Sequence, residues 1–437
     1  MASRLDQLAD LLHCPACGAA QWRTSGTNID GALACGGCAV SFPVTHGVLD
    51  LGERGQDAQV AAERAAALNT ERQPALGGIN DAFDDLANAT GELRDALCAL
   101  PHGNDSRYYR EPGYFANVRA SAPAFTFLIE HLDLRPGRRA LDLGADLTWS
   151  TCHLARRGLD CTAVDINHHL SVGRLLGAHF GIDYHLVRAD MRTVPFRDAS
   201  FDIVFVMSAL HHNPELNGVA AHIARMLRPG GQLAFVEPYC ASEEAKAAFG
   251  REQIAAGISE QTYLLGEWHD AFVSAGFDVQ ALRVCESFCA VYGKRGDTSG
   301  APAPTGISGL FEGAYRGRLT VGDESVRQVR SGTAWSIPVT IHNGSHAAWC
   351  SHSQFPVHLS YHLYRRSGAG DELISYDNVR TALPGVVNPG DRTQVSLNGT
   401  AITEPGTYVV EIDLVHEYIT WFGPKGLEAR PQLLIVV

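Results

Sequence analysis

The stretch ALDLGADLTWSTCHLARRGLDCTAVD, from Ala140 to Asp165, decides the fold. An apolar strand ends in Asp142 and Gly144, an amphipathic helix follows, and a second strand ends in Asp165. Asp165 follows Gly144 by 21 residues, the spacing at which a carboxylate binds the ribose hydroxyls of a nucleotide in α/β folds. Because this spacing serves both NAD and S-adenosylmethionine (SAM), it predicts an α/β nucleotide site and leaves the cofactor open.

Three further motifs follow in a fixed order: Arg188-Ala189-Asp190-Met191, the apolar strand Phe201 to Met207, and Leu227-Arg228-Pro229-Gly230-Gly231. With the first stretch they resemble the class I SAM-dependent methyltransferases that act on small molecules, over about residues 132–292. The resemblance implies an α/β, Rossmann-like sheet and SAM as the cofactor. It also implies three groups of SAM-binding residues, for methionine, ribose and adenine in turn: Asp142, Gly144, Ala145 and Asp146; Asp165 and Ile166; Asp190 and Met191.

The loop after the first strand departs from the family pattern Gly-x-Gly-x-Gly. Only Gly144 is kept, and Asp146 and Thr148 stand where the pattern has glycines. Side chains there narrow the approach of a ligand to the backbone, although Asp tolerates a left-handed backbone and its carboxylate suits the ammonium of SAM. Two interpretations stay open: retained SAM binding, and a degenerate domain without catalysis.

Two histidines, His211 and His212, follow the fourth predicted strand, where open α/β sheets bind ligands. An imidazole that titrates near neutral pH can accept the proton of a hydroxyl nucleophile, so both are candidate general bases. Glu237, at the end of the next strand, is a further candidate of this kind. The alternative is that methyl transfer needs only the alignment of donor and acceptor.

Four of the 11 cysteines form two Cys-x-x-Cys pairs with 17 residues between them. Four thiolates can enclose one Zn²⁺ in a closed, structural site. A dithiol redox pair and an iron–sulfur site are the alternatives. The segment resembles the short zinc ribbons that precede some bacterial methyltransferases, and the predicted Zn²⁺ ligands are Cys14, Cys17, Cys35 and Cys38.

An aromatic and basic segment, Arg107 to Phe115, precedes the first strand of the nucleotide site. It is interpreted either as a lid over a substrate or as a segment packed on the domain. Residues 81–100 show helical periodicity, and further helices are expected over 121–134, 244–256 and 267–275.

Beyond about Gly309 the pattern changes to short alternating strands, expected at 335–341, 357–363, 393–397 and 408–415. This pattern predicts an antiparallel, immunoglobulin-like β-sandwich. Five aromatic or imidazole side chains in it form either a glycan-stacking surface or part of the sandwich core or of a domain interface: Trp349, Tyr361, His362, Trp421 and Phe422.

The chain is therefore divided into a zinc ribbon (1–53), a helical connecting segment that covers the cleft (54–131), a SAM-binding methyltransferase domain (132–294), a linker (295–308) and a β-sandwich (309–437). With 437 residues, 45% of them hydrophobic, several cores are expected. The net charge of −13 and the lack of a basic stripe argue against nucleic-acid binding.

The first residues carry charges among apolar side chains, so we expect neither a signal peptide nor a membrane span, and a cytoplasmic location. The sequence predicts a SAM-dependent methyltransferase acting on a small molecule, with a hydroxyl of a saccharide or glycan precursor as the hypothesis for the acceptor. The alternatives are a non-catalytic scaffold that binds glycan or protein and a methyltransferase of secondary metabolites. No oligomeric state is predicted.

Overall fold

The computed structural model describes residues 3–51, 60–62, 65, 86–249, 251–255, 259–296, 304–322 and 326–437. The chain forms two compact units, one of Met1–Gln280 with Cys289–Ala303 and one of Ala281–Phe288 with Pro304–Val437. Most of the predicted connecting segment up to residue 85, and most of the predicted linker, lie outside the described residues.

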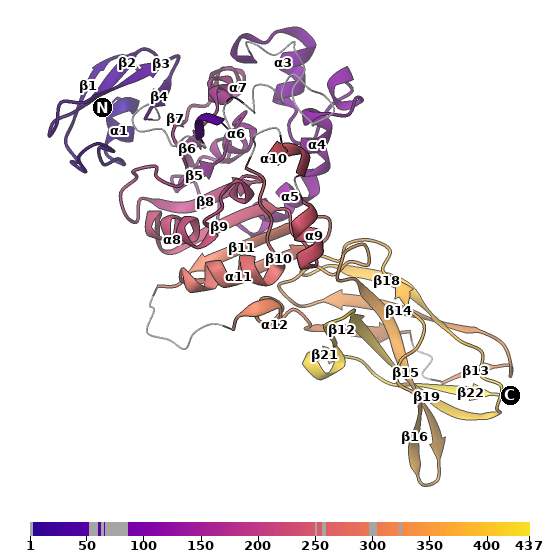
Figure 1. Ribbon diagram of the computed structural model, residues 1–437. Helices are drawn as coiled ribbons and strands as arrows, with labels where there is room; N and C mark the ends of the chain where they lie inside the picture. The colour runs from indigo at the N-terminus through magenta and orange to yellow at the C-terminus, as the bar shows by residue number, and fades with distance from the viewer. Residues whose placement is uncertain are drawn as a thin grey trace. The chain divides into compact units, whose positions relative to one another are not determined.

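The first unit is built on a sheet of order β1-β2-β3-β4-β7-β6-β5-β8-β9-β11-β10 (Figure 1). Its middle strands β7, β6, β5, β8 and β9 are parallel neighbours. The strands are β1 Trp22–Gly26, β2 Gly31–Cys35, β3 Ser41–Thr45, β4 Val48–Asp50, β5 Arg139–Leu143, β6 Asp160–Asp165, β7 His185–Arg188, β8 Phe201–Met207, β9 Leu227–Glu237, β10 Phe277–Val284 and β11 Phe288–Lys294.

The central strands are mainly apolar because helices cover both faces of a parallel sheet. In β8, for example, Phe201 and residues 203–206 are all buried. The helices of this unit are α1 Arg4–Ala9, η3 Leu86–Asn88, α3 Gly91–Cys98, η4 Arg107–Tyr109, α4 Tyr114–Ala120, α5 Ala122–His131, α6 Trp149–Ala155, η5 His168–Ser171, α7 Val172–Phe180, η6 Leu210–His212, α8 Leu216–Met226, α9 Glu243–Ala248, α10 Arg251–Ala255 and α11 Leu265–Ser274.

Two predicted helices differ from those found. The helix expected over 244–256 is two helices, α9 and α10, because Phe249 has an extended backbone with ψ 145°. Of the helical periodicity over 81–100, the described part forms η3 and α3. None of the helices in the described part of the chain has the length and the hydropathy that crossing a bilayer requires.

The cysteine-rich N-terminal segment extends the central sheet. Its last strand, β4, pairs in parallel with β7, with Asp50 opposite Arg188. The two side chains of this pair also form an ion pair, and the Leu51 N–H donates to the Arg188 carbonyl at 3.0 Å. The segment covers what would otherwise be an unpaired edge of the parallel sheet.

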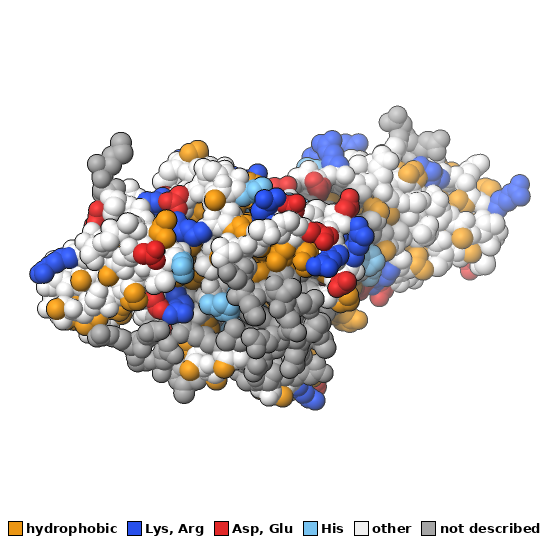
Figure 2. All heavy atoms as spheres, turned by 90° about the horizontal axis from the view of Figure 1, so that it is seen from above, with side chains coloured by type: hydrophobic (Ala, Val, Ile, Leu, Met, Phe, Trp, Pro, Cys, Tyr) orange, Lys and Arg blue, Asp and Glu red, His pale blue; other side chains and the backbone are white. Residues whose placement is uncertain are grey.

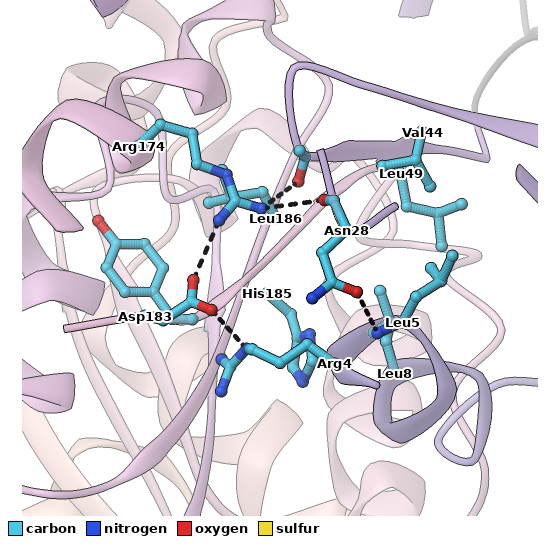
Figure 3. A pocket seen from close by; sticks show the side chains of 12 residues that line it. Arg4, Leu5, Leu8, Asn28, Val44, Leu49, Arg174, Asp183, His185 and Leu186 are labelled. Atoms are coloured by element: carbon cyan, nitrogen blue, oxygen red, sulfur yellow. Dashed lines mark hydrogen bonds and ion pairs between the residues drawn. The ribbon is translucent and has the colours of Figure 1, made fainter. Parts of the chain in front are cut away.

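A polar pocket lies where this segment meets α7 and β7 (Figure 3). Asp183 bridges two arginines, with Arg4 Nε at 3.1 Å and Arg174 Nη1 at 3.0 Å. Arg174 also donates to the Gly47 carbonyl at 3.0 Å, and the Leu5 N–H donates to Asn28 Oδ1 at 3.2 Å. These bonds tie α1 and the β-strands of the cysteine-rich segment to the central sheet.

The second unit contains two sheets, of order β18-β14-β12-β21 and β13-β22-β19-β15-β16, with β17 paired to β15 and β20 paired to β19. The elements are α12 Gly306–Leu310, β12 Gly317–Val321, β13 Val326–Val329, β14 Trp335–Asn343, β15 Val357–Ser367, β16 Gly370–Ser375, β17 Thr381–Ala382, β18 Arg392–Gly399, β19 Gly406–His416, β20 Thr420–Trp421, η7 Gly423–Lys425, β21 Leu427–Glu428 and β22 Gln432–Val436. The four strands expected from the sequence are confirmed as β14, β15, β18 and β19.

The core of this unit lies between its sheets. Trp335 on β14 packs on Tyr361 on β15, with ring centroids 4.9 Å apart. Trp349, Tyr361 and Phe422 are at most 2% exposed, and His362 is also buried. The proposed glycan-stacking surface is therefore wrong for these four side chains, because burial between strands leaves no ring face for a sugar.

Candidate functional site

The loop after β5 lies directly against the end of β6. The Gly144 and Ala145 N–H groups donate to the Val164 carbonyl at 2.9 and 3.1 Å. The Asp146 N–H donates to Asp165 Oδ2 at 2.8 Å. Four predicted SAM-binding residues are thus brought together at one edge of the sheet.

The loop keeps a left-handed backbone at the three positions where the family pattern has glycines. The φ angles are 69° at Gly144, 40° at Asp146 and 56° at Thr148. For a residue with a Cβ this conformation costs roughly 1–2 kcal/mol, less for Asp. The Thr148 hydroxyl lies 3.0 Å from that of Tyr184, a contact that helps to hold the residue there. Asp146 and Thr148 therefore adopt a backbone conformation that glycine adopts readily.

Asp142, at the end of β5, is almost fully buried. Its Oδ2 accepts hydrogen bonds from the Ser150 and Thr151 hydroxyls, both at 2.6 Å. Its Oδ1 is buried and has no hydrogen-bond partner among the described residues. Burial raises the pKa of Asp142 to about 6. A buried acceptor without a partner fits a donor supplied by a ligand.

Asp165 ends β6 and faces the loop, with the half-buried Ile166 after it. Its second oxygen accepts the Asn167 N–H at 2.8 Å. Burial, together with the nearby charge of Asp146, raises the pKa of Asp165 to about 6. Each carboxylate oxygen has a second lone pair, so the group can still accept two ribose hydroxyls.

Asp190 and Met191 follow β7. Both oxygens of Asp190 are held by the Arg192 guanidinium in a bidentate pair, with a shortest distance of 2.7 Å, and the Arg192 N–H donates to Oδ1. Met191 lies beside the loop that follows β5. Its Cε is 3.3 Å from the position that a Cβ on Gly144 would occupy. The adenine contact that the resemblance implies for Asp190 stays a prediction.

Two side chains hold the Asp146 carboxylate: His169, which the sequence did not single out, and Tyr114 of the aromatic segment. His169 Nδ1 lies 3.1 Å from Asp146 Oδ1, and the Tyr114 hydroxyl also hydrogen-bonds to this carboxylate. Burial opposes ionisation, but these bonds lower the pKa of Asp146. Tyr114 begins α4, so one side chain of the aromatic segment Arg107–Phe115 reaches the glycine loop.

The same segment also packs on the domain. Tyr109 and Phe115 are buried and meet edge to face, with ring centroids 5.4 Å apart. The packing interpretation is therefore confirmed for Tyr109 and Phe115, and the lid over a substrate stays a prediction.

His211 is fixed by Glu237, which ends β9. Glu237 is fully buried and accepts the Ala209 and Leu210 N–H groups at 2.9 and 2.8 Å. Its other oxygen lies 2.7 Å from His211 Nδ1. Because both of its carboxylate oxygens accept bonds from the segment 209–211, Glu237 positions the loop after β8.

A second carboxylate faces the other side of the His211 ring. Glu260 Oε2 lies 3.4 Å from His211 Nε2. Burial lowers the pKa of His211, but the two carboxylates outweigh it and raise the pKa to about 10. His212 differs, because burial and the neighbouring His211 charge lower its pKa. Near neutral pH, His211 is therefore protonated and His212 is neutral.

The four cysteines come together at the start of the chain. The Cys14 and Cys38 sulfurs lie 3.8 Å apart, those of Cys17 and Cys35 lie 3.6 Å apart, and all four lie within 4.8 Å of one another. Four thiolates about 2.3 Å from one Zn²⁺ in a tetrahedron would be about 3.8 Å apart. The geometry therefore fits the predicted ion.

On the face shown in Figure 2, the basic side chains of the described residues are interspersed with acidic ones. No continuous basic surface is visible among the described residues there. This distribution agrees with the net charge of −13.

Residues 141–235 match a family model described as a methyltransferase domain. The chain contains a methyltransferase domain. It is 35% identical over 108 residues to the demethylmenaquinone methyltransferase of Corynebacterium efficiens, a match of 25% of this chain and 45% of that protein. It is 33% identical over 124 residues to a sterol 24-C-methyltransferase of Gibberella zeae, a match of 27% of this chain and 32% of that protein. The chain spans less than half the length of these two curated relatives.

Two similar solved structures also carry methyltransferase titles. One is a putative sarcosine dimethylglycine methyltransferase from Galdieria sulphuraria, with a TM-score of 0.37, 14% identity, and 41% of this chain and 87% of that one covered. The other is a complex of the Haloferax volcanii Trm112 methyltransferase activator with a putative methyltransferase. The TM-score is 0.35, the identity is 18%, and the match covers 42% of this chain and 96% of that one.

Gly144→Ala is expected to destabilise the methyltransferase domain by about 2–4 kcal/mol, because left-handed backbone strain adds to overpacking. The new Cβ would stand 2.2 Å from the Ala209 Cβ. Gly137→Ala is the matched control, since Gly137 has φ 83° but no atom within 4 Å of the added carbon. Urea unfolding of both variants measures the difference, and equal losses would contradict the close approach at Gly144.

Proposed function

We propose that the protein transfers the methyl group of SAM to a hydroxyl oxygen of a small molecule. One observation carries the proposal. The ends of the parallel neighbours β5 and β6 and the start of the η6 segment after β8 lie around the left-handed loop that contains Gly144, Asp146 and Thr148. This is the edge at which open α/β sheets bind their ligands.

The residues proposed for SAM are those of the sequence analysis. Asp142, Gly144, Ala145 and Asp146 would receive the methionine part, and the unpartnered Asp142 Oδ1 supports a donor there. Asp165 with Ile166 would bind the ribose, and Asp190 with Met191 would border the adenine. The left-handed loop argues for retained SAM binding rather than a degenerate domain.

The histidines of η6 are proposed to face the acceptor. His212 Nδ1 is bonded to the Ser259 carbonyl at 2.8 Å, which leaves Nε2 for an acceptor hydroxyl. Its lowered pKa keeps it neutral near pH 7, as a general base must be. His211, held between two carboxylates, is proposed as a positioning residue.

The acceptor is proposed to be a small molecule. The relatives are named for a menaquinone precursor and a sterol, which supports a small molecule. The saccharide acceptor of the sequence analysis has no support from these names and stays a hypothesis. A screen with methyl-labelled SAM against quinols, phenols, sterols and sugars tests the proposal, and no labelled product together with no SAM binding would overturn it.

The four-cysteine cluster is proposed to hold a structural Zn²⁺. All four ligand positions are filled by cysteine, so no position remains for a reacting water. The immunoglobulin-like description of the second unit and the cytoplasmic location also remain proposals.

The affinity for SAM is expected to fall as the pH drops through about 6. Ribose hydroxyls donate to an ionised Asp165, and burial raises the pKa of this group to about 6. Calorimetric titrations between pH 5 and 8 should show a Kd that is constant above pH 7 and rises toward tenfold per pH unit below 6. In Asp165→Asn this dependence should shrink, and a flat wild-type profile would contradict the assignment.

The stability of the ligand-free protein should change in the opposite direction. Asp142 and Asp165 have folded-state pKa values of about 6, above the value of 3.8 for the free side chain. The folded state therefore binds more protons than the unfolded state between these values, and these two groups make unfolding harder as the pH falls from 7 to 5.

A further inference from the structure

Three side chains near the predicted methyl donor form a cluster of metal-ligand type. His211, His212 and Glu260 each offer one ligand atom, and these atoms lie within 4.8 Å of one another. His211 and His212 belong to η6, and Glu260 comes from the segment before α11. The Gln261 N–H donates to the His211 carbonyl at 2.9 Å, which ties the two segments together.

The Nδ1 atom of each imidazole has a hydrogen-bond partner of the kind that metal-binding histidines have. His211 Nδ1 lies 2.7 Å from the buried Glu237 carboxylate, and His212 Nδ1 lies 2.8 Å from the Ser259 carbonyl. Metal-ligating histidines almost always donate one N–H to a carboxylate or a backbone carbonyl, which fixes the ring and leaves the other nitrogen for the ion. Both rings of this cluster meet that condition.

The charges in the cluster also favour a dication. Glu237 and Glu260 both lie against the one His211 ring, and Glu237 is fully buried. A proton on His211 offsets only one of these two charges. A divalent ion in place of that proton would offset both.

We propose that His211, His212 and Glu260 bind a Zn²⁺-type divalent transition metal, in a site separate from the four cysteines. Two imidazole nitrogens select such an ion over Mg²⁺ or Ca²⁺, which prefer oxygen ligands. Three protein ligands leave a position open for an oxygen of the acceptor.

The role of this ion rests on the proposed methyl transfer. An acceptor hydroxyl that binds at the open position would release its proton to solvent, because the cation would stabilise the oxyanion. The oxygen then forms a bond to the methyl carbon while the carbon–sulfur bond breaks, and the electron pair stays on the sulfur. The sulfonium and the oxyanion become a neutral thioether and an ether. The site lies close to the donor loop, because η6 directly follows Ala209, which packs on Gly144.

The test uses Co²⁺ added to the full-length protein whose cysteine cluster is filled with zinc. We expect one further equivalent of Co²⁺, with visible d–d absorption and without the thiolate charge-transfer band that exchange at the cysteines would give. Glu260→Gln and His212→Ala should each weaken this binding by on the order of 100-fold or more, since even partners beyond the ligands change metal affinity 10–100-fold. Glu237→Gln alters such a partner and should weaken Co²⁺ binding about 10–100-fold.

Glu243→Gln is the matched control, because Glu243 is an exposed glutamate of α9 in the same unit. It should bind Co²⁺ as the unaltered protein does. Absence of the second equivalent, or retention of the signal in both Glu260→Gln and His212→Ala, would overturn the proposal. SAM titrations of the same proteins separate this outcome from the proposed function, since SAM binding without Co²⁺ binding refutes only the metal site.

Discussion

Asp165→Ala should weaken SAM binding by about 100-fold or more. Two ribose hydroxyls that donate to a charged group contribute about 1.5–3 kcal/mol each, and both bonds are lost in the variant. The residue also accepts the Asp146 and Asn167 N–H groups, so the alanine variant loosens the loop as well. Calorimetric titration with SAM measures the change.

Two further variants separate the loss of a ligand contact from a loss of structure. Asp165→Asn keeps one acceptor oxygen and should show a smaller loss of affinity. Asp160→Ala removes the same kind of side chain from the opposite end of β6 and should leave the affinity unchanged. If Asp165→Ala bound SAM as tightly as Asp160→Ala, the ribose assignment would be wrong.

Cys17→Ser should release the metal of the four-cysteine cluster and unfold the segment that carries it. Apparent zinc binding of about 10–16 kcal/mol provides most of the folding free energy of so small a unit. Cys17 is exposed, so its replacement costs little packing and acts through the metal. Metal analysis and calorimetric unfolding should show less zinc and a lower Tm.

The same variant should also weaken SAM binding, because the cysteine-rich segment supports the strand that leads to Asp190. The Leu51 N–H donates to the Arg188 carbonyl, and β4 pairs with β7 at Asp50 and Arg188. Cys98→Ser is the control, since Cys98 is half-buried on α3 and outside the cluster. Unchanged zinc content and Tm in Cys17→Ser would contradict a structural metal.

Much of the first unit could be predicted from the sequence because its signals are local. Runs of apolar residues predicted the bounds of β5 and β8 closely. The acids at strand ends indicated that Asp142 and Asp165 lie at the same edge of the sheet. The spacing of two Cys-x-x-Cys pairs sufficed to predict a cluster of Cys14, Cys17, Cys35 and Cys38.

The conformation of the loop after β5 depends on residues far from it in the sequence. A pattern of residue types indicates which backbone conformations cost little energy. It suggested that Asp146 and Thr148 could alter the conformation of the loop. The structure has both in the left-handed region, with His169 holding the Asp146 side chain and Tyr184 facing that of Thr148. These partners lie more than 20 residues away, so no local signal could reveal them.

The sequence by itself therefore determined the elements, the acidic strand ends and the cysteine cluster, because strand period, ligand spacing and turn chemistry act over a few residues. The tertiary structure decided which side chains meet across long separations. It placed Glu237 and Glu260 on either side of His211, and it buried Trp349 between strands. It also joined β4 to β7, a pairing that depends on the open edge of a sheet and on no residue pattern in either strand.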